Sequence, residues 1–170
     1  MSRLALRAFG AEDDAALIGW IASAEELERF AGPTLAWPLT SAQLEALRAD
    51  PRVHAWTAYT DRVARSPVGH VEVVRVAAGT GRLARVLLAP ARRGEGLGAP
   101  LAAAAMAYAS ALGMARLELN VLADNVAAIR AYRRLGFADA GEHPADPRVR
   151  TYVRAKPESV ENRRIRAQVM

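Results

Sequence analysis

The sequence contains no cysteine. This absence excludes a disulfide framework, a thiolate metal site and a cysteine nucleophile. Long apolar runs are also missing, because charged residues or glycine interrupt every alanine-rich stretch before the ~20 apolar residues of a membrane span. Residues 1–7 lack the apolar core and cleavage-like site of a signal peptide. These absences predict a cytoplasmic protein that does not act at a membrane.

Lysine is nearly absent, since Lys156 is the sole one, and arginine carries the net charge of +5. A basic surface suits polyanions such as nucleic acid, anionic lipid or a phosphorylated cofactor. The arginines are scattered in pairs, however, and no long basic run with interleaved aromatic residues occurs. We therefore do not expect nucleic acid as a partner.

The bulk composition is that of a globular protein. Hydrophobic residues make up 52% of the 170 residues and charged residues 24%, and no internal repeat or long linker divides the chain. We predict one domain over residues 1–157, followed by a basic C-terminal tail over residues 158–170.

Hydrophobic periodicity and turn residues predict strands followed by alternating helices and strands, which is an α/β pattern. Ser23 and Thr40 each begin a capping-box pattern and predict short helices after them. Asp124 is expected to cap a later helix, which Gly136 ends. The predicted strands are residues 4–8, 54–59, 68–76, 82–88, 116–122, 137–141 and 150–155, and the main helices are residues 12–21, 98–112 and 125–135.

A glycine-rich loop lies between a predicted strand and helix. Three glycines at alternate positions, Gly94, Gly96 and Gly98, leave the backbone free to adopt conformations that other residues avoid. Backbone N–H groups at the positive end of the following helix suit a pyrophosphate, and Arg93 adds a positive charge. The loop is not a nucleotide-binding P-loop, since no Gly-Lys-Ser/Thr follows, and it departs from the dinucleotide fingerprint. A tight turn without a ligand is the alternative.

A second group of polar residues follows the predicted strand over residues 116–122. Asn125 opens the next helix, and Tyr132 lies seven residues later, two turns along on the same face. An amide and a phenol are therefore aligned along one side of a helix at the edge of the sheet. Taken alone, the pair is equally compatible with a partly buried tyrosine and a helix-starting asparagine.

The two motifs together resemble those of the GCN5-related N-acetyltransferase (GNAT) superfamily. Arg93-x-x-Gly96-x-Gly98 is similar to its Arg/Gln-x-x-Gly-x-Gly/Ala signature, and the segment from Asn125 through Tyr132 to Gly136-Phe137 is similar to its second motif. The resemblance covers residues 68–137 and looks most like the ribosomal-protein and small-molecule branches. It implies the GNAT fold, a mixed and mostly antiparallel sheet of six to seven strands with helices on both faces.

The resemblance also implies an N-acetyltransferase that uses acetyl-CoA as co-substrate and needs no metal. Tyr132 would protonate the CoA thiolate, and Asn125 would hydrogen-bond the pantetheine arm. Strand residues would pair with the pantetheine amides, and loop residues would cradle the pyrophosphate. The strand set is Val86, Leu87 and Leu88, and the loop set is Arg93, Gly94, Glu95, Gly96, Leu97 and Gly98.

The base that deprotonates the acceptor amine is left open by the sequence. Many members of the superfamily carry a glutamate five residues before the asparagine, where this chain has Asn120. Glu72 is the first candidate base, followed by His70 and Glu118, and a water relay is the alternative.

The acceptor is expected to be a small-molecule amine or a protein or peptide amine, bound near residues 20–40 and the turn at Glu142-His143. Glu25, Glu26 and Glu28 could attract a cationic amine, although a solvated helix face explains them as well. The chain would act as a monomer or homodimer. The alternative function is a non-catalytic acyl-CoA-binding module on the same fold.

Overall fold

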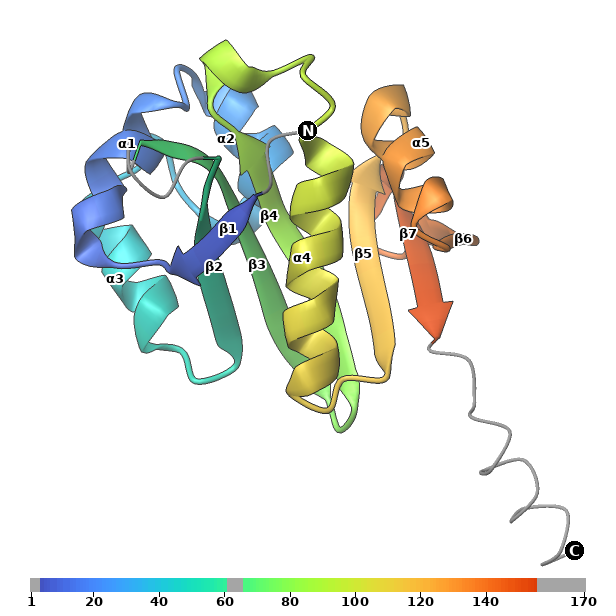
Figure 1. Cartoon of the computed structure of the whole chain (residues 1–170). Coiled ribbons are helices and arrows are strands. Elements are labelled where there is room, and N and C mark those ends of the chain that lie inside the picture. Colours follow the sequence, from blue (N-terminus) through green and yellow to red (C-terminus); the bar gives the residue numbers. More distant parts are fainter. Residues whose placement is uncertain (1–3, 61–65, 156–170) are drawn as a thin grey trace, which may run out of the picture.

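The computed structural model describes residues 4–60 and 66–155. They form one seven-stranded sheet of order β1-β2-β3-β4-β5-β7-β6 (Figure 1). Neighbouring strands are antiparallel except β4 and β5, which are parallel. This confirms the mixed, mostly antiparallel sheet. The strands are β1 (Ala5–Ala8), β2 (Val53–Tyr59), β3 (Pro67–Ala77), β4 (Thr80–Leu88), β5 (Arg116–Leu122), β6 (Ala138–His143) and β7 (Asp146–Ala155).

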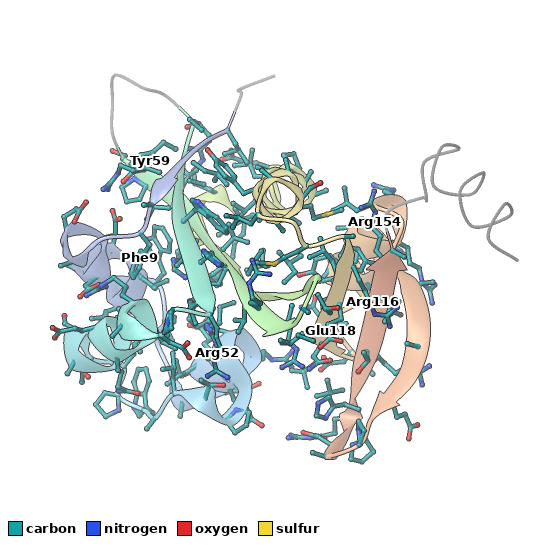
Figure 2. The ribbon with its side chains drawn as sticks, turned by 90° about the horizontal axis from the view of Figure 1, so that it is seen from below. Phe9, Arg52, Tyr59, Arg116, Glu118 and Arg154 are labelled. Carbon is teal, nitrogen blue, oxygen red and sulfur yellow. The ribbon has the colours of Figure 1, made fainter. Side chains whose placement is uncertain are left out.

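Helices cover both faces of the sheet, as expected (Figures 1 and 2). On one face α4 (Gly98–Ala111) and α5 (Val126–Arg134) pack over a core that includes Leu101 and Leu119. On the other face α1 (Asp14–Gly19), α2 (Ala24–Ala31) and α3 (Ser41–Ala49) enclose a second core around Leu17 and Leu44. The sheet therefore separates two hydrophobic layers, and only residues on its strands can connect them.

The helix starts follow local sequence signals. The Ser23 and Thr40 side chains accept hydrogen bonds from the backbone N–H groups of Glu26 and Gln43, which confirms both predicted caps. The cap of α5 is Asn125, whose side chain accepts from Ala128, so the assignment of Asp124 as that cap was wrong.

Other element bounds differ from the predictions. The expected helix over residues 12–21 is divided into a 3₁₀ turn, Ala11–Asp13, and the short α1. The last strand begins at Asp146 rather than residue 150, because its first residues pair with the end of β6. The predicted tail, residues 158–170, lies outside the described residues.

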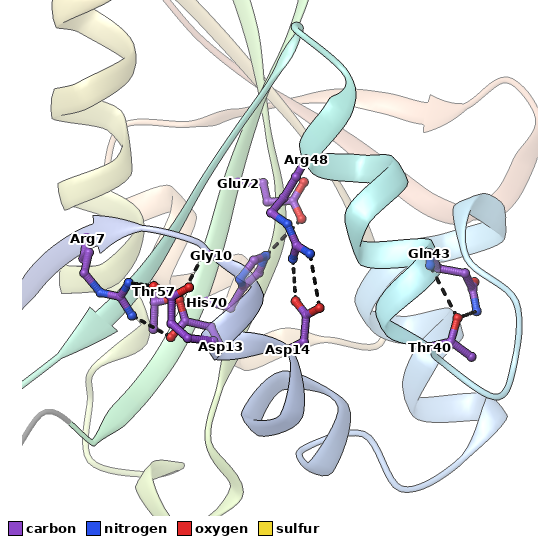
Figure 3. Close-up of polar contacts among 11 residues, drawn as sticks. Arg7, Gly10, Asp13, Asp14, Thr40, Gln43, Arg48, Thr57, His70 and Glu72 are labelled. Carbon is purple, nitrogen blue, oxygen red and sulfur yellow. Dashed lines mark hydrogen bonds and ion pairs between the residues drawn. The ribbon is translucent and has the colours of Figure 1, made fainter.

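A buried carboxylate fixes the first helical layer to the sheet. Asp13 is 4% exposed and accepts hydrogen bonds from Arg7, Thr57 and the backbone N–H of Gly10 (Figure 3), and also from Tyr59, at 2.8–3.1 Å. Such multiple donors are what a buried carboxylate requires. The contacts join the start of α1 to β1 and β2.

Candidate active site

The parallel strands β4 and β5 pair along only part of their length. Their register runs from Thr80 opposite Arg116 to Leu83 opposite Leu119 and then stops, although both strands continue. On its other side β4 remains paired with β3 as far as Leu88. Within residues 4–60 and 66–155, the C-terminal half of β4 therefore has one edge without a neighbouring strand. Extended molecules bind such edges through their amide groups.

The predicted strand residues lie on this half of β4. Val86 and Leu88 pack against the core under α4 and α5, whereas Leu87 packs against the core under α1–α3. Their side chains are thus anchored alternately in both layers. This alternating packing fixes the backbone of residues 86–88, which is expected to pair with the acyl donor.

The glycine loop follows β4 directly and leads into α4. Gly94 and Gly96 have φ values of +81° and +75°, in the left-handed region that favours glycine. Gly98 begins the 14-residue helix α4, so its unpaired N–H groups face the loop. The buried Leu97 anchors the loop to the core. The structure has the backbone of an anion site at the end of the unpaired edge.

Charged side chains in the loop have different contacts. The Arg92 guanidinium forms an ion pair with both carboxylate oxygens of Glu95 and thereby lowers the pKa of Glu95. Arg93 is half exposed, contacts the carbonyl of Leu88 at 3.4 Å and lies 4.0 Å from Glu26 of α2. The guanidinium of Arg93 is thus held beside the loop by weak contacts, compatible with its predicted role toward a phosphate.

Tyr132 lies on α5, on the same side of the sheet as Val86 and Leu88. All three side chains pack against the same core cluster, and the Tyr132 ring makes an edge contact with Phe137 at 6.0 Å between centroids. Desolvation raises the pKa of Tyr132 to about 12. A phenol with this pKa stays protonated at neutral pH, so Tyr132 presents an O–H donor on this side of the sheet.

Asn125 lies at the N-terminal end of α5, where the amide oxygen accepts from Ala128 at 3.3 Å. Its predicted hydrogen bond to a pantetheine arm stays a prediction. The cap nevertheless orients the side chain at the end of the sheet where β4 and β5 part.

Glu72 is a buried carboxylate with two side-chain partners. The Glu72 side chain is 2% exposed. One of its oxygens lies 3.0 Å from His70 Nε2 (Figure 3), and the other lies 2.5 Å from the guanidinium of Arg85. Burial alone would raise the pKa of Glu72, but the hydrogen bond with His70 and the ion pair with Arg85 outweigh it and lower the pKa. An ionised carboxylate in this pair accepts hydrogen bonds, so His70 donates through Nε2.

The lowered pKa of Glu72 predicts a pH-dependent contribution to stability. The contribution is fully present above the unfolded-state pKa of about 4.3 and is lost as pH falls through the lower folded-state pKa. We expect Glu72→Gln to cost about 3–5 kcal/mol at neutral pH, because it leaves the buried guanidinium of Arg85 without a charged partner. Urea unfolding at a series of pH values should show this difference shrinking on acidification. A difference that grows toward low pH would contradict the assignment.

The other residues considered for the base have structural partners. Glu118 of β5 forms an ion pair with Arg82 of β4 at 2.6 Å, within the paired part of the two strands. Asn120 accepts a hydrogen bond from Thr151 of β7 at 3.0 Å. Neither of these two pairings was predicted from the sequence.

Helix α2 lies across the end of the sheet where the two strands part, and ion pairs join it to both sides. Arg29 binds both carboxylate oxygens of Asp124, at 3.2 and 2.9 Å, and Glu28 contacts Arg148 at 2.9 Å. Glu26, near Arg93, also accepts from the Ala22 N–H. The acidic face of α2 is therefore exposed but ion-paired, which matches the solvated-face interpretation.

The described residues hold neither a metal-binding cluster nor a membrane-spanning helix. No three histidine or acidic side chains within residues 4–60 and 66–155 gather in a way that could hold a metal ion. None of the helices described there is long and apolar enough to cross a bilayer.

Comparison with known proteins supports the family resemblance. The model of the Acetyltransferase (GNAT) family matches residues 22–137. Mycothiol acetyltransferases are similar over shorter stretches: the Renibacterium salmoninarum protein is 36% identical over 83 residues, and that of Saccharopolyspora erythraea 45% over 60. These stretches are 49% and 35% of this chain and only 21% and 20% of the relatives' own lengths.

Solved structures match over nearly the whole chain. The spermidine N-acetyltransferase of Vibrio cholerae, solved with CoA and spermine, has a TM-score of 0.75 at 19% identity, covering 92% of this chain and 97% of that one. A domain from Methanocaldococcus jannaschii also gives 0.75, at 15% identity, with coverage of 91% and 99%. At these identities the likeness shows the fold.

Proposed function

Because this chain belongs to the acetyltransferase (GNAT) family, whose members use acetyl-CoA, we propose that it transfers the acetyl group of acetyl-CoA to a primary amine. The observation that carries the proposal is the unpaired edge of β4 that ends in the glycine loop and the N-terminus of α4. Such an edge and loop fit the two chemical parts of the donor, the amide-bearing pantetheine arm and the anionic pyrophosphate.

The proposed reaction is a direct transfer. The amine nitrogen attacks the thioester carbonyl carbon, the carbon–sulfur bond breaks, and Tyr132 gives its hydroxyl proton to the departing thiolate. The nitrogen loses a proton to water or a basic side chain, and Tyr132 regains one from solvent. A backbone N–H near Leu88 would polarise the carbonyl. This route requires no covalent intermediate on the enzyme, in keeping with the absence of cysteine.

We propose a small-molecule amine as the acceptor. Two groups of similar proteins are named for small molecules, mycothiol and spermidine. The ribosomal-protein branch, a peptide acceptor, the monomeric or dimeric state and a cytoplasmic location remain predictions from the sequence.

The test is release of CoA thiol from acetyl-CoA in the presence of polyamines, amino sugars, aminoglycosides and peptides. Acceptor-dependent release with one class of amine would support the transferase and name its substrate class. Binding of acetyl-CoA without turnover across the panel would instead favour the non-catalytic acyl-CoA-binding module. Asn120, in place of the glutamate of many members, is the feature that favours this second function. Failure to bind acetyl-CoA would exclude both.

A further inference from the structure

The strand β4 contains a bulge at the point where it leaves β5. His70 pairs with Leu87 and Glu72 with Ala84, so one residue of β3 lies opposite two of β4, Arg85 and Val86. Arg85 has a φ of +47° and is the one non-glycine residue of the described chain with a positive φ. A left-handed backbone is strained for an L-residue, so surrounding contacts must hold it.

The side chain of Arg85 provides such a contact. It is 8% exposed, and its guanidinium lies 2.5 Å from the Glu72 carboxylate, which is 2% exposed and lies on the neighbouring strand. A buried guanidinium without a carboxylate partner is strongly destabilising, so the pair keeps the Arg85 side chain turned toward β3. The backbone conformation of Arg85 is thereby tied to the position of Glu72.

The Glu72 carboxylate is itself held in place by His70, which borders the core under α1–α3. His70 contacts its second oxygen at 3.0 Å and is 1% exposed. The His70 ring lies edge-on to Phe9 and Phe30, at 4.6 and 5.9 Å between centroids. Phe30 belongs to α2, so the chain of contacts runs from the helical layer through β3 to the bulge in β4.

The bulge determines which part of β4 is left unpaired. The last residue of β4 paired with β5 is Leu83, two positions before Arg85. An extra residue in a strand bends it and increases its local twist, which carries Val86, Leu87 and Leu88 away from β5. These are the residues whose backbone would bind the pantetheine arm.

We infer that Glu72 and Arg85 are positioning residues for the acyl donor: their buried ion pair holds the left-handed bulge that separates β4 from β5. Glu72 then acts on the reaction through Arg85 and not as the base that deprotonates the acceptor. The inference rests on the proposed function, because it assigns the bulged edge to acetyl-CoA.

The test uses glycine to separate the two roles of Glu72. Glycine adopts a positive φ without an ion pair. Glu72→Gln should weaken binding of CoA by roughly ten- to hundredfold, the effect of an ångström-scale misplacement. Adding Arg85→Gly to Glu72→Gln should restore CoA affinity to within about threefold of the wild type. Glycine adopts the left-handed conformation of the bulge without needing the ion pair. Adding Arg85→Met, which removes the unpaired charge but keeps the strain, should leave CoA binding weak.

Titration calorimetry with CoA and the pH profile of kcat/KM provide the two readouts. If Glu72 is a positioning residue, the Glu72→Gln/Arg85→Gly protein keeps the rise of kcat/KM with pH. A base role predicts that this rise is lost in every Glu72→Gln protein, with CoA affinity unchanged and no rescue by glycine, which would overturn the inference. Asp14→Asn breaks another half-buried pair, with Arg48 of α3, and controls for general destabilisation.

The outcomes also separate this inference from the proposed function. If the wild-type protein binds CoA and the Glu72→Gln protein binds it equally well, the inference fails and the proposed function stands. If the wild type does not bind CoA, both fail. A Glu72→Gln protein that does not fold leaves the comparison between the two double variants, in which equal CoA affinity would overturn the inference.

Discussion

Replacing Tyr132 by phenylalanine is expected to lower kcat for acetyl transfer by about 10²–10⁴-fold, the usual contribution of a positioned proton donor. The substitution keeps the ring that packs against Phe137 and the core, and removes only the hydroxyl group. Because desolvation raises the pKa of Tyr132 to about 12, the phenol stays protonated across the neutral range. The wild-type rate should therefore show no fall due to this group between about pH 7 and pH 10.

The measurement is steady-state thiol release together with the affinity for CoA. We expect a loss in kcat with little change in CoA binding, since the hydroxyl acts on the leaving thiolate. Tyr108→Phe is the matched control, because Tyr108 lies on α4, is 44% exposed and stacks on Trp56 through its ring. Equal kcat values for the wild type and Tyr132→Phe would remove Tyr132 from the mechanism.

Replacing Gly96 by alanine is expected to weaken acetyl-CoA binding by more than a hundredfold. Gly96 has a φ of +75°, and an added Cβ would meet no other atom within 4 Å, so the effect comes from the backbone. Relaxation of φ toward negative values would turn the loop N–H groups away from the pyrophosphate. Loss of two hydrogen bonds to a charged group, at about 1.5–3 kcal/mol each, gives this magnitude.

Gly113→Ala provides a control with the same strain at a different place. Gly113 has a φ of +80°, also has no atom within 4 Å of an added Cβ, and lies after the opposite end of α4. Both substitutions should cost similar stability, about 1–2 kcal/mol for a left-handed alanine. Calorimetry should find weakened acetyl-CoA binding for Gly96→Ala alone. Equal losses of affinity in the two variants would mean that strain, and not the loop, is responsible.

Local signals in the sequence determined most elements of this fold. The caps at Ser23 and Thr40, the glycine after α5 and the alternation of apolar residues in the strands each depend on neighbours a few residues away. The glycine loop is a local signal of the same kind. Its backbone takes left-handed conformations at Gly94 and Gly96, which glycine favours, so the loop can be recognised from the sequence. The family followed from this loop and the α5 motif together.

The tertiary structure decided what depends on partners far apart in the chain. Arg85 is one arginine among many in the sequence, and its burial against Glu72 depends on a strand register that no local pattern contains. The ion pair of Arg29 with Asp124, the residue expected to cap α5, spans 95 positions. The sequence alone therefore determined the fold family and the loop that suits acetyl-CoA. Only the folded sheet decided where β4 parts from β5 and which buried charges hold it there, because both depend on how separate strands align.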